Sequence, residues 1–349
     1  MNRRQFVAAT AAGAASAATS IAAPFIQPAA AQARGLTGPT QATKGAIDIS
    51  DRVKGYTVDS VRNHSINAYY VKGLEGTVAI DTLWRIPEAE DALGRFRALT
   101  GRSTENIDAV LITHMHSDHY GGLATYRAAS GNAPAFATRT VHRVIENDEH
   151  GFYANRIKDF GTDIPKEIPV PDTGLFDGVT FESGGVTIEP TVLRSNEALE
   201  TTLLYYPEDR VLFTADLVNN QTTPVFYQGE IDSWLTQLKG LRARFPEAET
   251  IAPGHGPAGD FDELIRDEIA YLETFRSLVE NELERGGGAV TSEGVQRIKN
   301  RIVDAFPNWR TSAGVPSRDR LIELNINWTL RGWRIDGPDA ASPAEFRDG

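Results

Sequence analysis

Cysteine is absent from this sequence of 349 residues. Its absence excludes disulfide bonds, thiolate metal ligands, a cysteine nucleophile and a lipid anchor on an N-terminal cysteine. Any metal ion must therefore be held by nitrogen and oxygen atoms. Histidine is also scarce, with seven copies in the whole chain, so a place where several of them gather is informative.

Basic residues are fewer than acidic ones, with 35 Lys and Arg against 47 Asp and Glu and a formal net charge of -12. Nucleic acid is therefore not expected as a partner, because an acidic protein is repelled by the phosphate backbone. Long hydrophobic runs are also missing. Beyond the N-terminal segment no apolar run approaches the roughly 20 residues that cross a bilayer, so we expect no membrane span in the mature protein.

The first 33 residues have the pattern of an export signal. Arg3 and Arg4 precede a weakly apolar, alanine-rich run, and Ala31-Gln32-Ala33 fits cleavage before Arg34. The opening MNRRQFVAAT resembles a twin-arginine signal, which passes folded proteins to dedicated export machinery; an ordinary secretory signal is the alternative. Loss of the two arginines without any acid takes the net charge to -14. We expect a soluble periplasmic protein in which residues 34–50 form a flexible arm.

Two runs of short strands, each followed by helices, are predicted over residues 51–259. In the first run, a helix opens at Pro87 and carries acidic residues in its first turns, as helix N-termini prefer. Sheet packed on sheet, with helices outside, buries both layers, so we expect an α+β fold of four layers, an αββα sandwich. Residues 260–349 are predicted to be a helical C-terminal extension that covers the outer face, shapes an entrance or makes a dimer contact.

Three histidines and an aspartate fall within six positions directly after an apolar strand, in the stretch LITHMHSDHYGG. His114, His116, Asp118 and His119 are spaced so that a tight turn can direct alternate side chains at two neighbouring ions. Three of seven histidines would not gather here by chance, so we interpret the stretch as a metal-binding loop.

This loop, preceded by Asp81 in AIDTL and followed by FTADL and APGHG, resembles the metallo-β-lactamase superfamily over roughly residues 53–259. The resemblance implies an αββα sandwich with a dinuclear, usually zinc, centre. It implies these roles: His114 and His116 as ligands of the first ion, Asp118, His119 and His255 as ligands of the second, Asp216 as the bridging carboxylate, and Asp81 as a residue that steadies the histidine loop.

The third histidine that most members supply to the first ion is missing, because no histidine occurs between His150 and His255. Glu197 is nearest the missing position, with Glu200 as the fallback. A glutamate here resembles the alkylsulfatase branch of the superfamily, although that branch usually carries a second glutamate where this chain has Asp216, and its further C-terminal domains do not fit this length. In the alternative interpretation, Glu197 is solvated and the site is mononuclear or degenerate.

Several other residues have open roles in the sequence. Asn219 and Asn220 resemble the polar substrate-contact stretch of the alkylsulfatases. Tyr120 either touches substrate or packs under the loop, His142 and His150 are expected to be solvated, and residues 159–177 are expected to form a surface loop that could border an entrance.

Together these patterns predict an exported hydrolase that holds two divalent ions, with zinc expected and manganese or iron left open. Asp118 and Asp216 are the residues expected to act in catalysis, on a small-molecule substrate with an ester-like bond. A sulfate ester is favoured over a lactone or a β-lactam, and β-lactamase or lactonase activity is the alternative. A non-catalytic periplasmic protein that binds metal or a small ligand is the alternative from another class. The oligomeric state has no signal in the sequence.

Overall fold

The computed structural model describes residues 45–59, 65–312 and 315–335, so the predicted export signal lies outside the described residues. β1 (Gly45–Asp48) pairs antiparallel with β2 (Val53–Asp59). The prediction of a flexible arm was therefore wrong for the last residues of 34–50. β1 was not predicted because a strand of four residues is too short to show a periodic pattern in the sequence.

The first sheet has seven strands in the order β1 to β7. Strands β1 to β4 pair antiparallel, whereas β4 to β7 pair parallel. Parallel neighbours need crossover connections, which helices supply here. The remaining strands are β3 (Ser65–Lys72), β4 (Thr77–Ile80), β5 (Ile107–Leu111), β6 (Ala135–Ala137) and β7 (Asp172–Thr173).

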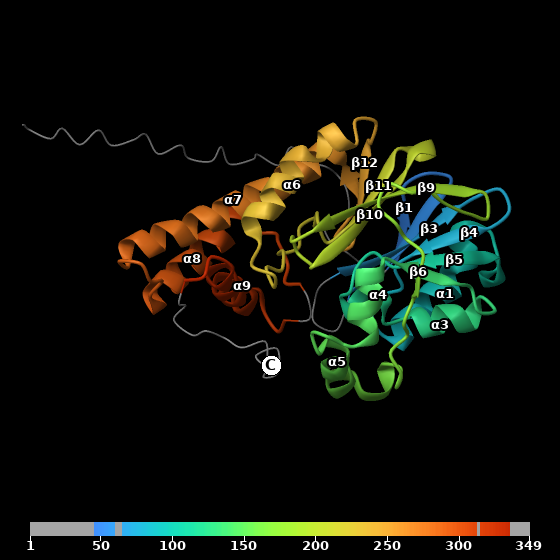
Figure 1. The fold of residues 1–349 in the computed structure, drawn as a ribbon, viewed down its shortest axis with the longest axis horizontal. Coiled ribbons are helices and arrows are strands. Elements are labelled where there is room, and N and C mark those ends of the chain that lie inside the picture. Colours follow the sequence, from blue (N-terminus) through green and yellow to red (C-terminus); the bar gives the residue numbers. More distant parts are fainter. Residues whose placement is uncertain (1–44, 60–64, 313–314, 336–349) are drawn as a thin grey trace, which may run out of the picture. The chain divides into compact units, whose positions relative to one another are not determined.

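Helices α1, α3 and α4 lie along one face of this sheet (Figure 1). α1 starts with Pro87 near its N-terminus and ends at Gly101, which adopts a left-handed φ of 75° that glycine allows without strain. The helices of this half are α1 (Ile86–Thr100), α2 (Ser117–Tyr120), α3 (Leu123–Ala129), α4 (Arg139–Glu146) and α5 (Phe152–Phe160), with short 3-10 turns η1 (Thr104–Asn106) and η2 (Gly161–Asp163). The surface loop predicted for 159–177 thus begins with the end of α5 and with η2.

The second sheet has six strands in the order β13-β12-β11-β10-β9-β8. All its neighbours are antiparallel except β11 and β12. Its elements are β8 (Phe181–Ser183), β9 (Val186–Arg194), β10 (Glu200–Tyr206), η3 (Pro207–Asp209), β11 (Val211–Ala215), α6 (Ile231–Arg244), β12 (Thr250–Pro253) and β13 (Gly259–Asp260).

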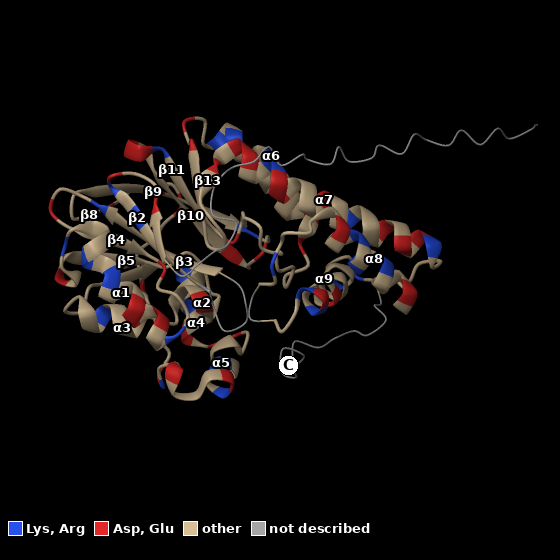
Figure 2. Ribbon diagram, turned by 180° about the vertical axis from the view of Figure 1, so that it is seen from behind, with Lys and Arg blue, Asp and Glu red and all other residues tan. Residues whose placement is uncertain are grey.

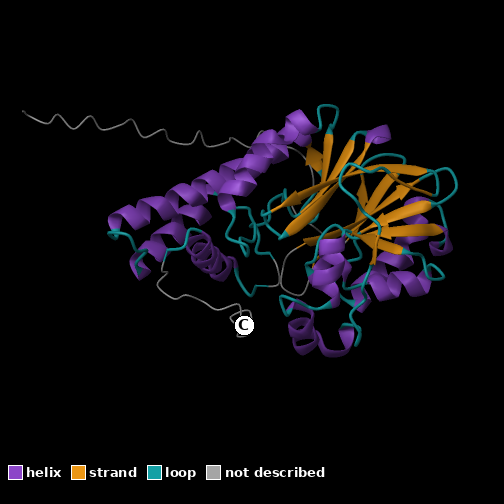
Figure 3. Ribbon diagram, viewed as in Figure 1, coloured by secondary structure: helices purple, strands orange, loops and turns teal. Residues whose placement is uncertain are grey.

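Alternating side chains of the strands enter different hydrophobic layers. On β10, Leu204 and Tyr206 pack between the sheets against side chains such as Val71 of β3, whereas Leu203 and Tyr205 face the helices of the second half. A third layer packs the other face of the first sheet on its helices. Figure 3 shows both sheets between helices, which confirms the expected αββα sandwich.

The C-terminal helices α7 (Phe261–Arg285), α8 (Ser292–Ala305) and α9 (Arg318–Gly332) share one hydrophobic layer with β10, β11 and α6. They are therefore part of the domain core rather than an appendage. Charged residues are spread over the helices, while the strands are mostly uncharged (Figure 2). Among the described residues, no helix is long and apolar enough to cross a membrane.

Candidate metal centre

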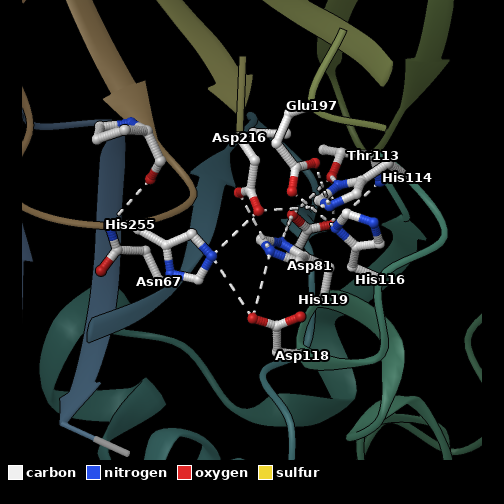
Figure 4. Close-up of polar contacts among 12 residues, drawn as sticks. Asn67, Asp81, Thr113, His114, His116, Asp118, His119, Glu197, Asp216 and His255 are labelled. Atoms are coloured by element: carbon white, nitrogen blue, oxygen red, sulfur yellow. Dashed lines mark hydrogen bonds and ion pairs between the residues drawn. The ribbon is translucent and has the colours of Figure 1, made fainter. Parts of the chain in front are cut away.

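Side chains from four separate stretches meet at one edge of the two sheets (Figure 4). The histidine loop follows β5, Asp216 follows β11 and His255 follows β12, so strand ends bring them to the same edge. Two groups of potential ligand atoms result, each with its atoms within 4.8 Å of one another. The first consists of His114, His116, Glu197 and Asp216, and the second of Asp118, His119 and His255.

Asp216 lies between the two groups. Its Oδ2 atom is 3.5 Å from Nε2 of His114 and 3.1 Å from Nε2 of His255, while its Oδ1 atom is 3.2 Å from Nε2 of His119. Both oxygens of this carboxylate thus face the second group and Oδ2 also faces the first, so Asp216 lies where a carboxylate could bridge two ions, as the resemblance implies.

Glu197 supplies the fourth side chain of the first group and is 1% exposed. Its Oε1 atom is 3.2 Å from Nδ1 of His116, and its Oε2 atom is 4.0 Å from Nε2 of His114. The fallback residue, Glu200, is held elsewhere, because it accepts a hydrogen bond from Thr138 and pairs with Arg194 at 2.8 Å. The structure therefore brings Glu197, and not Glu200, to the histidines.

Several buried ligand atoms have no hydrogen-bond partner among the described residues: Nε2 of His114 and His119, Oε2 of Glu197 and Oδ1 of Asp216. A buried polar atom without a hydrogen bond is costly, and these four face one another in two pairs, at 3.2 Å for His119 and Asp216 and at 4.0 Å for His114 and Glu197, as atoms around a shared cation would. Divalent cations bind this mixture of imidazole and carboxylate donors, so the residues fit the two ions that the sequence implies.

The orientation of the imidazole rings is set from outside the cluster. Nδ1 of His119 contacts Asp81 Oδ2 at 2.8 Å, Nδ1 of His114 contacts the Thr113 hydroxyl at 3.0 Å, and Nδ1 of His255 contacts the carbonyl of Ser65. Each of these rings therefore presents Nε2 to the centre, as metal-binding histidines do when an outer group fixes the other nitrogen.

Left-handed backbone conformations occur beside three of these acidic side chains. Asp81 itself has a φ of 57°, Ala215 precedes Asp216 with a φ of 47°, and Ser195 lies two residues before Glu197 with a φ of 58°. Such conformations cost energy outside glycine and tend to gather at functional sites. Here they turn the chain sharply where strands end, which directs the carboxylates toward the histidines.

Gly254 in the loop before His255 is required by close packing. A Cβ atom at this position would lie 2.2 Å from Oδ1 of Asp216 and 2.8 Å from Cε1 of His119. The same loop is tied to the first sheet by Asn67, whose amide donates to the carbonyls of Pro253 at 2.9 Å and Gly256 at 2.7 Å. No role was predicted for Asn67, because its hydrogen-bond partners lie 186 and 189 positions away along the chain.

Protons occupy the cluster when no ion is bound. Burial lowers the pKa of His116 to about 4, so this ring is neutral. Burial would also lower the pKa of His255, but the charge of Asp216 outweighs it and raises the value to about 9. Burial, together with the charge of Asp216, raises the pKa of Glu197 well above its ordinary range. Binding of divalent ions should therefore release protons.

A cleft of about 440 Å³, counted with its open mouth, leads to Asp118, His116 and Asp216. Its walls come from three places: Trp84 before α1, Phe152 and Arg156 of α5, and Val225 and Tyr227 before α6. None of these five wall residues was predicted, because each sits in a locally unremarkable stretch and only the tertiary fold brings them together.

The residues with open roles lie around the centre rather than in the cleft. Tyr120 is buried beneath the histidine loop, and its ring centre lies 6.2 Å from that of Tyr153, so of its two expected roles the structure supports packing under the loop. Asn219 donates from Nδ2 to the carbonyl of Asp216 at 3.1 Å, and Asn220 donates to the carbonyl of Pro257 at 2.7 Å. Neither asparagine is among the residues that line the cleft, and their contact with substrate stays a prediction.

The solvated position predicted for His150 was also wrong. The ring centre of His150 lies 5.3 Å from that of Phe152 and 5.6 Å from that of Tyr227, two residues of the cleft wall. Burial lowers the pKa of His150. His142 is only partly buried and contacts the carbonyl of Pro171 at 2.6 Å.

The C-terminal helices reach the centre and the cleft. Glu268 of α7 is fully buried and accepts a hydrogen bond from the backbone N–H of Asn219 at 3.2 Å. Asn325 of α9 is bonded to the backbone of Pro224 and Phe226, on both sides of Val225. Of the three roles expected for the extension, the structure supports covering the second sheet and shaping the entrance.

Comparisons with known proteins agree with this arrangement. A sequence profile of the metallo-beta-lactamase superfamily matches residues 61–255. The type 2 metallo-beta-lactamase of Bacteroides fragilis is 29% identical over 112 residues, which cover 31% of this chain and 44% of that enzyme. The linear primary-alkylsulfatase of a Pseudomonas species is 23% identical over 242 residues, which cover 58% of this chain and 45% of that enzyme. The chain thus spans less than half the length of both relatives.

Two solved structures share the fold. A metallo-beta-lactamase from Pontibacter korlensis has a TM-score of 0.53 and 21% identity, and covers 66% of this chain and 99% of its own. The sec-alkyl sulfatase PisA1 has a TM-score of 0.60 and 17% identity, and covers 88% of this chain and 52% of its own. With its sandwich fold and a profile match over more than half of its length, the chain belongs to the metallo-beta-lactamase superfamily.

Proposed function

We propose that the protein is a hydrolase that holds two divalent ions and cleaves an ester-like bond, with a sulfate ester as the preferred substrate. The observation that carries this proposal is the convergence of buried ligand atoms without hydrogen-bond partners, from His114, His119, Glu197 and Asp216. His114, His116 and Glu197 would hold the first ion, Asp118, His119 and His255 the second, and Asp216 would bridge them. Zinc fits four imidazoles and three carboxylates, with manganese or iron as the alternatives.

Two such ions, when bound, lower the pKa of a water molecule toward 7 and polarise the oxygen of the bond under attack, so no side-chain nucleophile is needed. The chain's own contribution is orientation. Asp118 lines the cleft, and its Oδ2 atom is 3.5 Å from Nε2 of His255 and 3.9 Å from Nε2 of His119. Its carboxylate can accept the proton of the attacking water and direct that water toward the substrate.

The preference for a sulfate ester is supported by the position of Glu197 beside His114 and His116, where it would take the place of the histidine usual in the family, and by the similarity to an alkylsulfatase. A β-lactam or a lactone is the second candidate, supported by the similarity to the Bacteroides enzyme. A protein that binds metal without turnover is the third.

A substrate panel with purified, metal-loaded protein separates these candidates. We expect hydrolysis of medium-chain alkyl sulfates at higher kcat/KM than that of lactones or β-lactams, and loss of all activity in His116→Ala. His142→Ala, a histidine away from the cluster, is the matched control and should retain activity. A metal-loaded protein that cleaves none of these compounds would leave the non-catalytic alternative, and unchanged activity of His116→Ala would refute the site.

We also propose that the protein is exported to the periplasm through the twin-arginine route, on the basis of Arg3 and Arg4. In cell fractionation, replacement of both arginines by lysine should keep the protein in the cytoplasm. Continued export of that variant would favour the ordinary secretory route.

A further inference from the structure

Arg156 of α5 lines the cleft beside the metal-binding side chains and is 4% exposed. Its position is fixed from two directions. Nη1 donates to Oδ2 of Asp159 at 2.7 Å, and the guanidinium carbon lies 5.2 Å from the centre of the Trp84 ring. An arginine held over an aromatic face by a carboxylate keeps one orientation and loses little conformational freedom on binding a ligand.

Arg156 is the only lysine or arginine among the described residues that line the cleft. The three candidate carboxylate ligands, Asp118, Glu197 and Asp216, carry three negative charges. Two divalent ions carry four positive charges, so the loaded centre would have a net charge of +1. Arg156 presents a guanidinium beside this centre, and the ion pair with Asp159 offsets its charge only in part, so the loaded cleft favours an anion.

The rest of the wall is apolar and aromatic. The ring centre of Phe152 lies 5.3 Å from that of His116 and 5.3 Å from that of Tyr227. Val225 lines the cleft as well. Tyr227 also packs edge to face against Trp328 of α9, with 5.6 Å between the ring centres. Such a surface binds hydrocarbon by removing it from water.

From this juxtaposition we infer that Arg156 determines specificity by pairing with an anionic oxygen group of the substrate, while Phe152, Val225 and Tyr227 hold an apolar substituent. The inference rests on the proposed function in placing the substrate in this cleft. It selects an anionic ester with a hydrocarbon part over a neutral ester, since a guanidinium forms paired hydrogen bonds with an oxyanion that are stronger than those with an uncharged ester oxygen. A sulfate head and a carboxylate are the two sources of that charge.

Binding of non-hydrolysable probes tests the inference without turnover. Hexane-1-sulfonate, hexanoate and hexan-1-ol share one alkyl chain and differ in the head group, and their affinities for the zinc-loaded protein can be measured by calorimetry. The variants are Arg156→Gln and Arg156→Lys, with Arg139→Gln as the control, because Arg139 is an exposed arginine of the neighbouring helix α4.

We expect Arg156→Gln to weaken binding of the preferred anion by about ten-fold or more, the size of a lost charge-assisted hydrogen bond, and to leave hexan-1-ol binding within about two-fold. Arg156→Lys should recover part of the loss, and Arg139→Gln should bind like the wild type. Stronger binding of sulfonate than hexanoate would identify a sulfate head, and the reverse a carboxylate.

Equal weakening of anion and alcohol in Arg156→Gln would overturn the inference, because it would mean that Arg156 only supports the wall. Anion binding that does not change in Arg156→Gln, or that is absent in the wild type, would overturn it as well. A substrate panel without turnover would count against the proposed function alone, since these affinities do not depend on catalysis.

Discussion

Asn325 offers a direct test of the view that the C-terminal helices build the cleft. This side chain of α9 is fully buried; its Oδ1 accepts from the N–H of Phe226 at 2.9 Å and its Nδ2 donates to the carbonyl of Pro224 at 2.8 Å. Asn325→Ala removes both bonds and leaves two buried backbone groups unpaired. At about 1–3 kcal/mol for each of the two unpaired groups, the free energy of unfolding should fall by about 2–6 kcal/mol.

The wall of the cleft should loosen at the same time, because Val225 and Tyr227 lie on the segment that Asn325 holds. We expect a higher KM for the best substrate with an unchanged metal content, since none of the candidate ligands contacts Asn325. Urea unfolding gives the stability, and Asn300→Ala on the exposed face of α8 is the control, with a loss below about 0.5 kcal/mol. A loss under about 1 kcal/mol in Asn325→Ala, with an unchanged KM, would refute this reasoning.

Three further predictions concern the surroundings of the centre. Asp81→Asn should lower the affinity for the second ion by about 10–100-fold in a chelator competition, because the charge that orients His119 is lost; unchanged affinity would contradict this role. Gly254→Ala should lower the metal content, since its Cβ would collide with Asp216, whereas Gly240→Ala on α6, where a Cβ meets nothing within 4 Å, should keep two ions. Burial raises the pKa of Glu268 in the folded protein well above its ordinary range. In the unfolded chain this carboxyl ionises with a pKa of about 4.3, so the free energy of unfolding of the wild type falls as the pH rises above that value. Glu268→Gln should therefore be more stable than the wild type in urea at pH 8 and equal to it at pH 4, and a stability difference that grows toward low pH would show that the sign is wrong.

The sandwich and the ligand cluster could be predicted from the sequence because their signals are local. Strand periodicity specifies which side chains are buried, and three histidines of one loop lie within six positions. Asp216 and His255 follow strands that end at the same edge, so the resemblance to a family could place them.

The cleft could not be predicted, because its wall is made by contacts between distant segments. Asn325 and Phe226 are 99 positions apart, and no local pattern marks either residue for this contact. Arg156 sits in a nine-residue helix with a mixed pattern, and its role depends on Trp84, which precedes a different helix. The edge strand β1 was missed for the same reason, since a strand of four residues depends on its neighbour.

Metal content of the purified protein and of Glu197 variants tests the central claim most directly. By elemental analysis after equilibration with zinc, we expect two ions per chain in the wild type, one in Glu197→Ala and two in Glu197→His, which restores the histidine usual in the family. Glu200→Ala should keep two ions, because Thr138 and Arg194 hold that carboxylate away from the cluster. A wild type without ions, or two ions in Glu197→Ala, would contradict a dinuclear centre with Glu197 as a ligand.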